Sequence, residues 1–497
     1  MNKYAVTYAR AAANLHAPLV TVETHIAPGL PRFTLVGLPE TAVRESKDRV
    51  RSAIIQNQFT FPVGRITVSL APADLPKAGA GFDLAIAIGI LVASKQLACK
   101  DLADYELFGE LALSGELRHC PRLFPAIVHS KSGGRACVIP IDNADEAALV
   151  NHPRLYAAPN LLAVCEHLTG IASLLPQAMK TPTAPEEPHY NLQDILGHTQ
   201  AKRALMIAAT GGHSLLMSGP PGSGKSMLAN RLPGILPLLN HADALTVASI
   251  QSLSNRFDPT TFAQRPFRAP HHSASGVAIV GGGSTPRPGE ISLAHHGVLF
   301  LDELPEFNRN VLESLREPLE SRAINIARAG YQITFPADFQ LIAAMNPCPC
   351  GHLTNPQQDC YCSPDQVKRY QSRISGPLLD RIDLHIAIYT TPINTSEKNT
   401  GPKSSVIREQ VAAAQTTQYQ RQGKLNAALN TQDLNMAQMC TKDAQSLLQD
   451  AHKKMGFSWR VYHRLLKIAQ TLADLAQSPH ILPEHLHEAL SYRPQID

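Results

Sequence analysis

The segment 219–226 constrains the fold of this 497-residue chain more than any other stretch. It has the sequence GPPGSGKS and fits the pattern G-x-x-x-x-G-K-S/T at every fixed position. An apolar run, 214–217, precedes it and predicts a buried strand, and a helix-compatible run, 226–232, follows it. A strand, a glycine-rich loop and a helix in this order form the context in which the pattern binds phosphate. We therefore expect a P-loop within an α/β domain.

The residue types in this loop have defined tasks in phosphate binding. Glycines let backbone N–H groups turn inward around phosphate oxygens, and the helix that follows adds its dipole. We expect Lys225 to reach the β- and γ-phosphates of ATP and the Ser226 hydroxyl to ligate Mg²⁺. The predicted nucleotide-binding residues are Gly219, Pro220, Pro221, Gly222, Ser223, Gly224, Lys225, Ser226 and Met227.

Length and composition limit the class of protein. A chain of 497 residues favours two or three domains, and a net charge of only +4 means that any nucleic-acid surface is local. Residues 1–10 lack the apolar region of a signal peptide, and the longest apolar stretch, 84–93, is too short to span a bilayer. We expect a cytoplasmic protein without a membrane partner, whose nine cysteines are thiols or metal ligands rather than disulfides.

The residues before the P-loop predict a separate α+β domain. Apolar and polar residues alternate in 65–70 as in a strand, and 107–117 has the pattern of a hairpin. The stretch 81–93 is apolar nearly all round, which predicts a buried helix. A proline-rich stretch within 173–190 then predicts an interdomain linker.

Two strand ends after the P-loop carry polar residues suited to ATP hydrolysis. The apolar run 298–301 ends at Asp302 and Glu303, and the run 340–344 is followed closely by Asn346. The carboxyl ends of parallel strands face the nucleotide crevice. We therefore expect Asp302 to hold Mg²⁺ through water, Glu303 to polarise the attacking water, and Asn346 to sense the γ-phosphate.

Two insertions in this region carry arginines and no acidic residue. The segment 321–335 alternates as a β-hairpin does, and 265–289 is too long and glycine-rich for a plain crossover. The arginines that we single out are Arg322 and Arg328 in the first and Arg268 and Arg287 in the second. Taken alone, two solvated surface elements are the simpler interpretation.

Four cysteines form the pattern C-x-C-x₉-C-x-C, namely Cys348, Cys350, Cys360 and Cys362. Four thiolates in a short loop suit tetrahedral Zn²⁺, and the prolines and glycine of this loop mean that a metal would order it. We predict a structural zinc site, with reduced surface thiols as the alternative.

Three segments resemble the magnesium-chelatase-like AAA+ proteins. They are 265–275 (RPFRAPHHSAS), 288–295 (PGEISLAH) and 301–307 (LDELPEF). The similarity to the ComM/YifB branch of that group covers essentially the whole chain. It implies a ring-shaped homohexamer that acts on DNA, with recombination proteins as possible partners, as a branch-migration helicase in natural transformation and recombination. It also implies that the two arginine-bearing insertions face the pore and that their arginines contact DNA.

The resemblance also implies roles for residues beyond the strand ends. Asn346 corresponds to sensor 1, and Arg381 to the arginine finger that reaches a neighbouring subunit. Arg460 corresponds to sensor 2 in a helical lid. Arg373 and Arg464 compete for the two arginine roles, and a local ion pair with Asp380 or Asp383 is the alternative for Arg381.

The first domain resembles the proteolytic domain of Lon, with similar segments at 76–81 and 109–115. A Ser–Lys dyad needs a hydroxyl and an amine within hydrogen-bond reach. Gly81 stands where the serine is expected and Phe124 where the lysine is expected. The resemblance therefore implies a retained fold without peptidase activity, and Lys77 remains a base without a nucleophile.

The predicted fold class is a multidomain α/β protein. Its parts are a Lon-protease-like α+β domain (1–172), a linker (173–190), a P-loop AAA+ α/β core (191–395) and a helical lid (396–497). The predicted function is an ATP-driven DNA motor. A magnesium-chelatase-type chaperone that remodels a protein partner and a Lon-like protease are the alternatives.

Overall fold

The computed structural model describes residues 3–11, 14–38, 40–75, 77, 79, 81–180, 190–283, 287–328, 331–353, 355, 358–389 and 401–493. The chain folds into two compact units. Unit 1 contains Met1–Ala184 and His241–Ala263, and unit 2 contains Pro185–Asn240 and Gln264–Asp497. A segment that interrupts the sequence of unit 2 therefore packs with unit 1. Residues 181–189 of the predicted linker lie outside the described residues.

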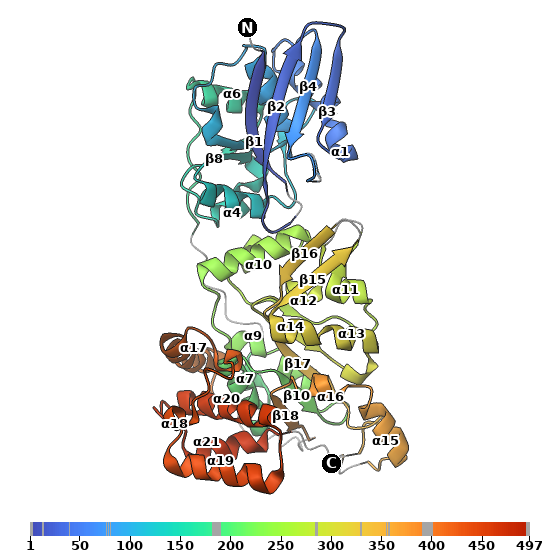
Figure 1. Ribbon diagram of the computed structural model, residues 1–497, viewed down its shortest axis with the longest axis vertical. Coiled ribbons are helices and arrows are strands. Elements are labelled where there is room, and N and C mark those ends of the chain that lie inside the picture. Colours follow the sequence, from blue (N-terminus) through green and yellow to red (C-terminus); the bar gives the residue numbers. More distant parts are fainter. Residues whose placement is uncertain are drawn as a thin grey trace. The chain divides into compact units, whose positions relative to one another are not determined.

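Unit 1 is built on a seven-stranded mixed sheet with the strand order β3-β4-β2-β1-β5-β8-β9 (Figure 1). Its strands are β1 (Tyr4–Arg10), β2 (Leu19–Ala27), β3 (Arg32–Val36), β4 (Arg65–Ala71), β5 (Tyr105–Leu107), β8 (Ala136–Pro140) and β9 (Leu155–Ala158). A small hairpin joins β6 (Glu110–Leu111) to β7 (Leu117–Arg118), within the segment where the sequence predicts one.

The helices of unit 1 include one helix from the inserted segment. They are α1 (Thr41–Arg44), α2 (Ser46–Gln56), α3 (Asp83–Ala93), α4 (Phe124–Gly133), α5 (Ala144–Ala148), α6 (Leu161–Thr169) and α10 (His241–Leu253). The apolar stretch that predicts a buried helix forms α3, which packs on β1 and β2 with nearly every residue buried. The inserted helix α10 packs on α4.

Unit 2 contains a five-stranded parallel sheet with the order β11-β14-β17-β10-β18. The strands are β10 (Leu215–Ser218), β11 (Phe267–Arg268), β14 (Val298–Leu301), β17 (Gln340–Met345) and β18 (Leu384–Ala387). Because β17 lies between β10 and β14, the ends of these three strands meet at one edge of the sheet. The unit thus places the P-loop, the Asp302-Glu303 pair and Asn346 together.

The remaining elements of unit 2 surround that sheet. Those that precede the C-terminal helices are α7 (Thr199–Gly211), α8 (Lys225–Ala229), α9 (Leu232–Ile235), α11 (Gly276–Val280), β12 (Gly281–Gly282), β13 (Arg287–Pro288), α12 (Glu290–Leu293), α13 (Arg309–Ser314), α14 (Arg316–Ser321), β15 (Ala323–Arg328), β16 (Tyr331–Pro336), α15 (Pro364–Gln371) and α16 (Gly376–Leu379). The predicted hairpin is β15–β16, and the segment predicted as an inserted loop contains a short helix and the β12–β13 hairpin.

The helix after the P-loop is shorter than the sequence predicts. The expected helix 226–232 is divided into α8 and α9. Pro233 stands in the first turn of α9, where the missing N–H costs nothing, but its ring disfavours continuation of the preceding helix.

The C-terminal part of unit 2 is helical and shares the core of the sheet. Its helices are α17 (Ser404–Gln422), α18 (Met436–Met439), α19 (Lys442–Met455), α20 (Trp459–Leu475) and α21 (Pro483–Ser491), at the red end of the colour bar in Figure 1. Leu465, Ile468 and Leu472 of α20 are buried in one cluster with Leu215 and Ile342 of the sheet. Among the described residues, no helix is both long and apolar enough to cross a membrane.

Candidate functional site

The loop between β10 and α8 has a shape that depends on its glycines. Gly222 and Gly224 have φ angles of 72° and 85°, in the left-handed region that glycine adopts without steric cost. A Cβ atom on Gly219 would lie 2.3 Å from the carbonyl oxygen of Ile388 on the neighbouring chain segment. These positions therefore tolerate no larger residue without a change in the loop.

Lys225 lies buried at the centre of this loop. Its Nζ donates hydrogen bonds to the carbonyl oxygens of Gly219 and Pro220, each at 2.8 Å, and to Oδ1 of Asn346 at 3.2 Å. Burial lowers the pKa of Lys225, and the carboxylates of Asp302 and Glu303 oppose that shift. The structure thus brings two predicted site residues, Lys225 and Asn346, into direct contact.

A hydroxyl and a carboxylate meet beside this lysine. The Ser226 hydroxyl donates to Oδ2 of Asp302 at 2.5 Å, and Oδ1 of Asp302 accepts from the backbone N–H of Glu303 at 2.9 Å. Mg²⁺ prefers hard oxygen ligands of this kind, with water and phosphate completing its shell. The donor set of Ser226 and Asp302 therefore fits Mg²⁺.

Glu303 contacts a histidine that the sequence did not single out for a role. Its Oε2 lies 3.1 Å from Nδ1 of His272, which belongs to the inserted segment 265–289. Both side chains are partly exposed, and Glu303 itself has a left-handed φ of 52°. A histidine in a polar loop carries no sequence signal for a partner 31 positions away, so only the fold could identify it.

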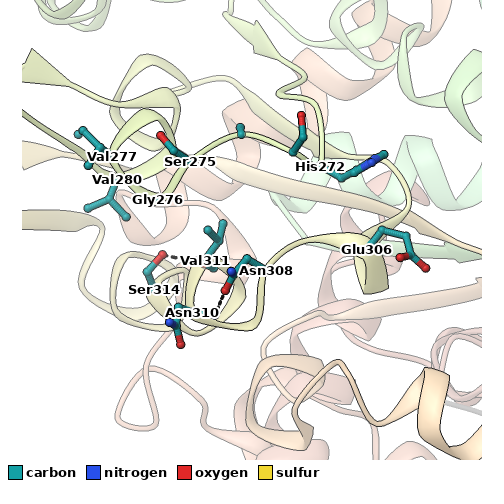
Figure 2. A pocket seen from close by; sticks show the side chains of 13 residues that line it. His272, Ser275, Gly276, Val277, Val280, Glu306, Asn308, Asn310, Val311 and Ser314 are labelled. Atoms are coloured by element: carbon teal, nitrogen blue, oxygen red, sulfur yellow. Dashed lines mark hydrogen bonds between the residues drawn. The ribbon is translucent and has the colours of Figure 1, made fainter.

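A cavity of about 820 Å³ begins at His272 and Glu306 (Figure 2). One wall consists of the inserted segment, with Ser275, Val277 and Val280, and the other consists of Asn308, Asn310 and Ser314. Its lining combines valines and an alanine with serine and asparagine side chains, and its ionisable residues are His272 and Glu306. The cavity therefore offers a phosphate group no lysine or arginine side chain.

The two arginines predicted to complete the site share one carboxylate. Arg381 Nη2 lies 2.6 Å from Oε1 of Glu320, and Arg460 Nη2 lies 3.3 Å from the same oxygen. The predicted alternative was an ion pair between Arg381 and a flanking aspartate, but its partner is Glu320 of α14. Asp383 instead pairs with His213 at 2.9 Å.

The competing arginines have other partners. Arg464 is buried and donates to the carbonyl oxygen of Ile382 at 2.7 Å. Arg373 pairs with Glu306 at 2.8 Å. Of the two α20 candidates, only Arg460 is exposed enough to reach a ligand outside its own chain.

Two of the four predicted DNA-contacting arginines are held in ion pairs. Arg268 makes two hydrogen bonds to Glu290, at 2.6 and 2.9 Å, and Arg322 pairs with Asp338 at 3.1 Å. Both acids lie just beyond the segments that contain no acid in the sequence. Arg287 is exposed, and the side chain of Arg328 lies outside the described residues.

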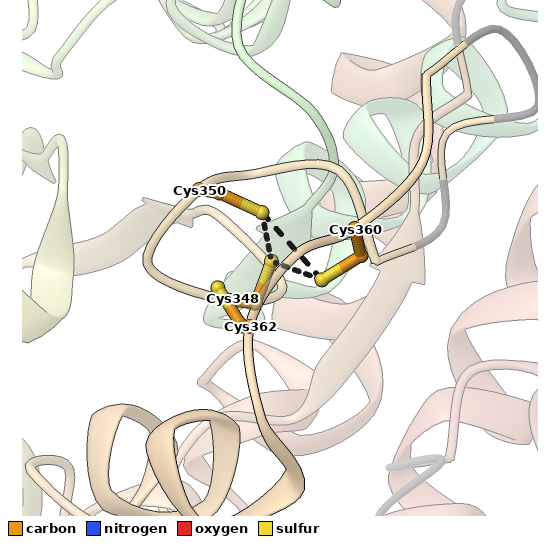
Figure 3. A group of neighbouring side chains, drawn as sticks. All are labelled: Cys348, Cys350, Cys360 and Cys362. Carbon is orange, nitrogen blue, oxygen red and sulfur yellow. Dashed lines mark hydrogen bonds between the residues drawn. The ribbon is translucent and has the colours of Figure 1, made fainter.

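The four cysteines converge as the sequence pattern predicts (Figure 3). The sulfur of Cys348 lies 3.3 Å from that of Cys350 and 3.6 Å from that of Cys360, and all four sulfurs lie within 4.8 Å of one another. Tetrahedral Zn²⁺ with bonds of about 2.3 Å separates its sulfur ligands by about 3.8 Å. The cluster, which also includes Cys362, therefore fits a zinc ion.

In unit 1, the described residues contain no nucleophile paired with a base at the position that resembles Lon. Lys77 is buried and donates to the carbonyl oxygen of Pro72. The Cys120 sulfur lies 3.9 Å from where a Cβ on Gly81 would stand, and burial raises the pKa of Cys120 to about 12. Phe124 packs on Phe257 of the inserted segment, with ring centroids 4.8 Å apart.

Comparison with known proteins decides the family. Models of the magnesium chelatase subunit ChlI match residues 191–396, residues 22–143 and, for its C-terminal part, residues 401–493. The competence protein ComM of Haemophilus influenzae is 50% identical over 501 residues, which cover 99% of this chain and 98% of that protein. The chain belongs to the ComM/YifB family. It is therefore a ComM homologue with AAA+ domains of the magnesium-chelatase type, as the sequence resemblance implied.

Other members of the ComM/YifB family match over similar lengths. The uncharacterized protein YifB of Salmonella typhimurium is 48% identical over 495 residues, covering 98% of this chain and 97% of that protein. The uncharacterized protein YifB of Escherichia coli is 47% identical over 493 residues, covering 98% and 96%. The similarity thus extends through both units.

Proposed function

We propose that this ComM/YifB-family protein is a Mg²⁺-dependent ATPase whose hydrolysis drives a homohexameric ring along DNA. The observation that carries the proposal is the group of contacts at the carboxyl edge of the parallel sheet, where Lys225 meets Asn346 and Ser226 meets Asp302. Ligands of open α/β sheets bind at this edge. The group combines a cation for phosphate with oxygen ligands for Mg²⁺.

Each side chain of this group has a separate task in phosphoryl transfer. Lys225 exchanges its loop carbonyls for the β- and γ-phosphate oxygens, and Asn346 beside it detects the γ-phosphate. Ser226 and Asp302 would hold Mg²⁺, which would neutralise charge on those phosphates. Glu303 orients the attacking water. To do so, its carboxylate gives up the contact with His272 and binds the water instead.

The two arginines on Glu320 act together and on a neighbouring subunit's ATP. Arg381 and Arg460 contact the same carboxylate and therefore lie close together. When Arg381 acts as the arginine finger, Arg460 reaches the same phosphate. The γ-phosphate takes the place of Glu320 in that complex. This arrangement makes hydrolysis depend on the ring, since each site needs residues from two chains.

We further propose that the motor moves DNA in natural transformation and recombination, as a branch-migration helicase. The name of the Haemophilus relative, a competence protein, supports this placement. Unit 1 then serves as a Lon-like domain without peptidase activity, and α17–α21 as the lid. Recombination proteins are its expected partners, and the cytoplasm its compartment.

We also propose that the four-cysteine cluster holds Zn²⁺, and purified protein is expected to contain about one zinc ion per chain. The double substitution Cys350→Ser/Cys360→Ser removes two of the four ligands and should abolish zinc binding. Cys99→Ser, outside the cluster, is the matched control and should retain the metal. Metal analysis that finds no zinc in protein purified without chelators would contradict the proposal.

Arg287 and Arg328 of the two insertions are expected to contact DNA phosphates. Arg328→Ala at the hairpin tip should weaken binding about equally for all sequences and make its salt dependence shallower by about one ion for each phosphate no longer neutralised. Arg322→Ala is the matched control, because Asp338 already neutralises that arginine. Titration of a labelled single strand at several salt concentrations measures both quantities. Equal slopes and affinities for wild type and Arg328→Ala would show that this residue does not contact DNA.

The experiment that tests the function compares ATP hydrolysis with no DNA and with single-stranded, duplex and forked DNA. A DNA motor is expected to hydrolyse ATP several times faster with at least one of these. Unchanged rates with all of them, together with stimulation by a protein partner, would favour a chaperone of the magnesium-chelatase type. Casein cleavage that is lost in Lys77→Ala would favour a protease.

A further inference from the structure

The cysteine loop begins immediately after the residue expected to sense the γ-phosphate. Strand β17 ends at Met345, Asn346 contacts Lys225, and Cys348 follows after a single proline. Two residues of chain span at most about 7 Å, so a metal on Cys348 and the amide of Asn346 cannot move independently. Cys348 is also fully buried, which fixes the start of the loop.

A second point of the loop lies against the P-loop itself. A Cβ atom on Gly351 would stand 2.5 Å from Cδ and 3.2 Å from Cγ of Pro221, a rigid ring in the middle of the P-loop. Gly351 has a φ of 84°, and its N–H donates to the carbonyl oxygen of Cys348 at 3.0 Å. Only glycine satisfies both this conformation and this close approach.

The other end of the loop is anchored on α15. Ser363, the residue after Cys362, caps that helix, and its side chain accepts from the backbone N–H of Gln366. Gln371 at the end of α15 donates to the carbonyl oxygen of Pro347 at 3.0 Å. None of the described residues within 348–362 belongs to a helix or strand, so the thiol cluster is the main element that can hold the loop in shape.

We propose that metal bound to the four cysteines controls nucleotide binding, by holding Gly351 against Pro221 and Asn346 beside Lys225. The ligand is a thiophilic divalent cation, with Zn²⁺ the best fit to the cluster. Removal of the metal frees the loop, and the P-loop is then no longer supported by Gly351. This inference rests on the proposed function in one respect, which is that the P-loop binds ATP.

The test measures the affinity of the full-length protein for a fluorescent ATP analogue in the presence of Mg²⁺, with metal content determined in parallel. Zinc is removed with a thiol reagent and a chelator, both are washed out, and Zn²⁺ is then returned. Metal removal is expected to weaken analogue binding about tenfold, equivalent to about 1.4 kcal/mol. Returning Zn²⁺ should restore it.

A second variant separates the Gly351–Pro221 packing from the metal. Gly351→Ala keeps all four cysteines and is expected to retain zinc but to bind the analogue about tenfold more weakly, the same 1.4 kcal/mol as metal removal. Gly423→Ala is the matched control, because Gly423 has a similar φ of 70° but an added Cβ would meet no atom within 4 Å. It should bind the analogue like wild type.

The possible failures are distinguishable. Wild-type protein that binds no ATP analogue at all would overturn the proposed ATPase function. Folded, zinc-free protein and Gly351→Ala protein that both bind the analogue with wild-type affinity would overturn this inference and leave the zinc site in place. Protein that neither contains nor takes up a thiophilic cation would overturn the inference together with the zinc site.

Discussion

Glu303→Gln is expected to bind ATP with nearly wild-type affinity and to lose almost all hydrolysis. The amide preserves the size of the side chain, and the contacts of Lys225, Ser226 and Asp302 do not involve it. A positioned general base contributes about 10²–10⁴-fold in rate, so the loss in kcat should fall in this range. Single-turnover hydrolysis and analogue binding measure the two quantities.

Glu317→Gln is the matched control for this substitution. Its carboxylate lies on α14 and accepts a hydrogen bond from Asn325 rather than His272. It should hydrolyse ATP at the wild-type rate. Wild-type turnover in Glu303→Gln would remove Glu303 from the chemistry and leave its contact with His272 as a structural one.

Arg381→Ala is expected to bind ATP normally and to hydrolyse it poorly. Arginine fingers contribute about 10³–10⁵ in kcat in related phosphoryl transfers, so the loss should be of at least the lower order. If the arginine acts on a neighbour, mixing this variant with Lys225→Ala should restore part of the activity. An interface between the P-loop of an Arg381→Ala subunit and the arginine of a Lys225→Ala subunit then has both groups intact.

Arg373→Ala tests the competing arginine, which pairs with Glu306. It should retain most activity and need no complementation. Mixed assemblies of Arg381→Ala and Lys225→Ala that form but stay inactive would show that Arg381 acts within its own chain. Arg460→Ala should behave as Arg381→Ala does in the same mixing experiment, because both arginines contact Glu320.

Local patterns in the sequence predicted which strand ends lie together in the structure. The P-loop glycines and lysine, the carboxylates after β14 and the asparagine after β17 each follow an apolar strand. In a parallel sheet such strand ends meet at one edge, so local order implies proximity. The cysteine spacing was informative for the same reason, since four thiols within 15 residues can surround one ion.

Contacts between distant segments were beyond the reach of these patterns. His272 meets Glu303, Glu320 meets both Arg381 and Arg460, and Gly351 meets Pro221 only because the chain returns to the same edge. Charge counts within a segment were also misleading. Arg268 and Arg322 lie in segments without acids, yet each is neutralised by an acid a short way beyond its segment.

Long-range contacts also explain why the segment 241–263 belongs to unit 1, which local sequence patterns do not indicate. Its apolar periodicity indicates a helix but not the surface on which the helix packs. In the structure, α10 lies on α4, His241 bonds to the carbonyl oxygen of Leu149 at 2.9 Å, and Phe257 packs on Phe124. Phe124 occupies the position where the resemblance to Lon expects a lysine. Its contact with Phe257 shows that this residue contributes to packing within unit 1.

The most direct test of the central claim is the movement of a labelled four-way DNA junction by purified protein. With ATP and Mg²⁺, the wild-type protein should convert the junction into duplex products, and Glu303→Gln and Arg381→Ala should not. Gels that resolve the junction from the products give the rate for each protein. Conversion by wild type that proceeds equally well without ATP, or no conversion despite DNA-stimulated ATP hydrolysis, would contradict the account.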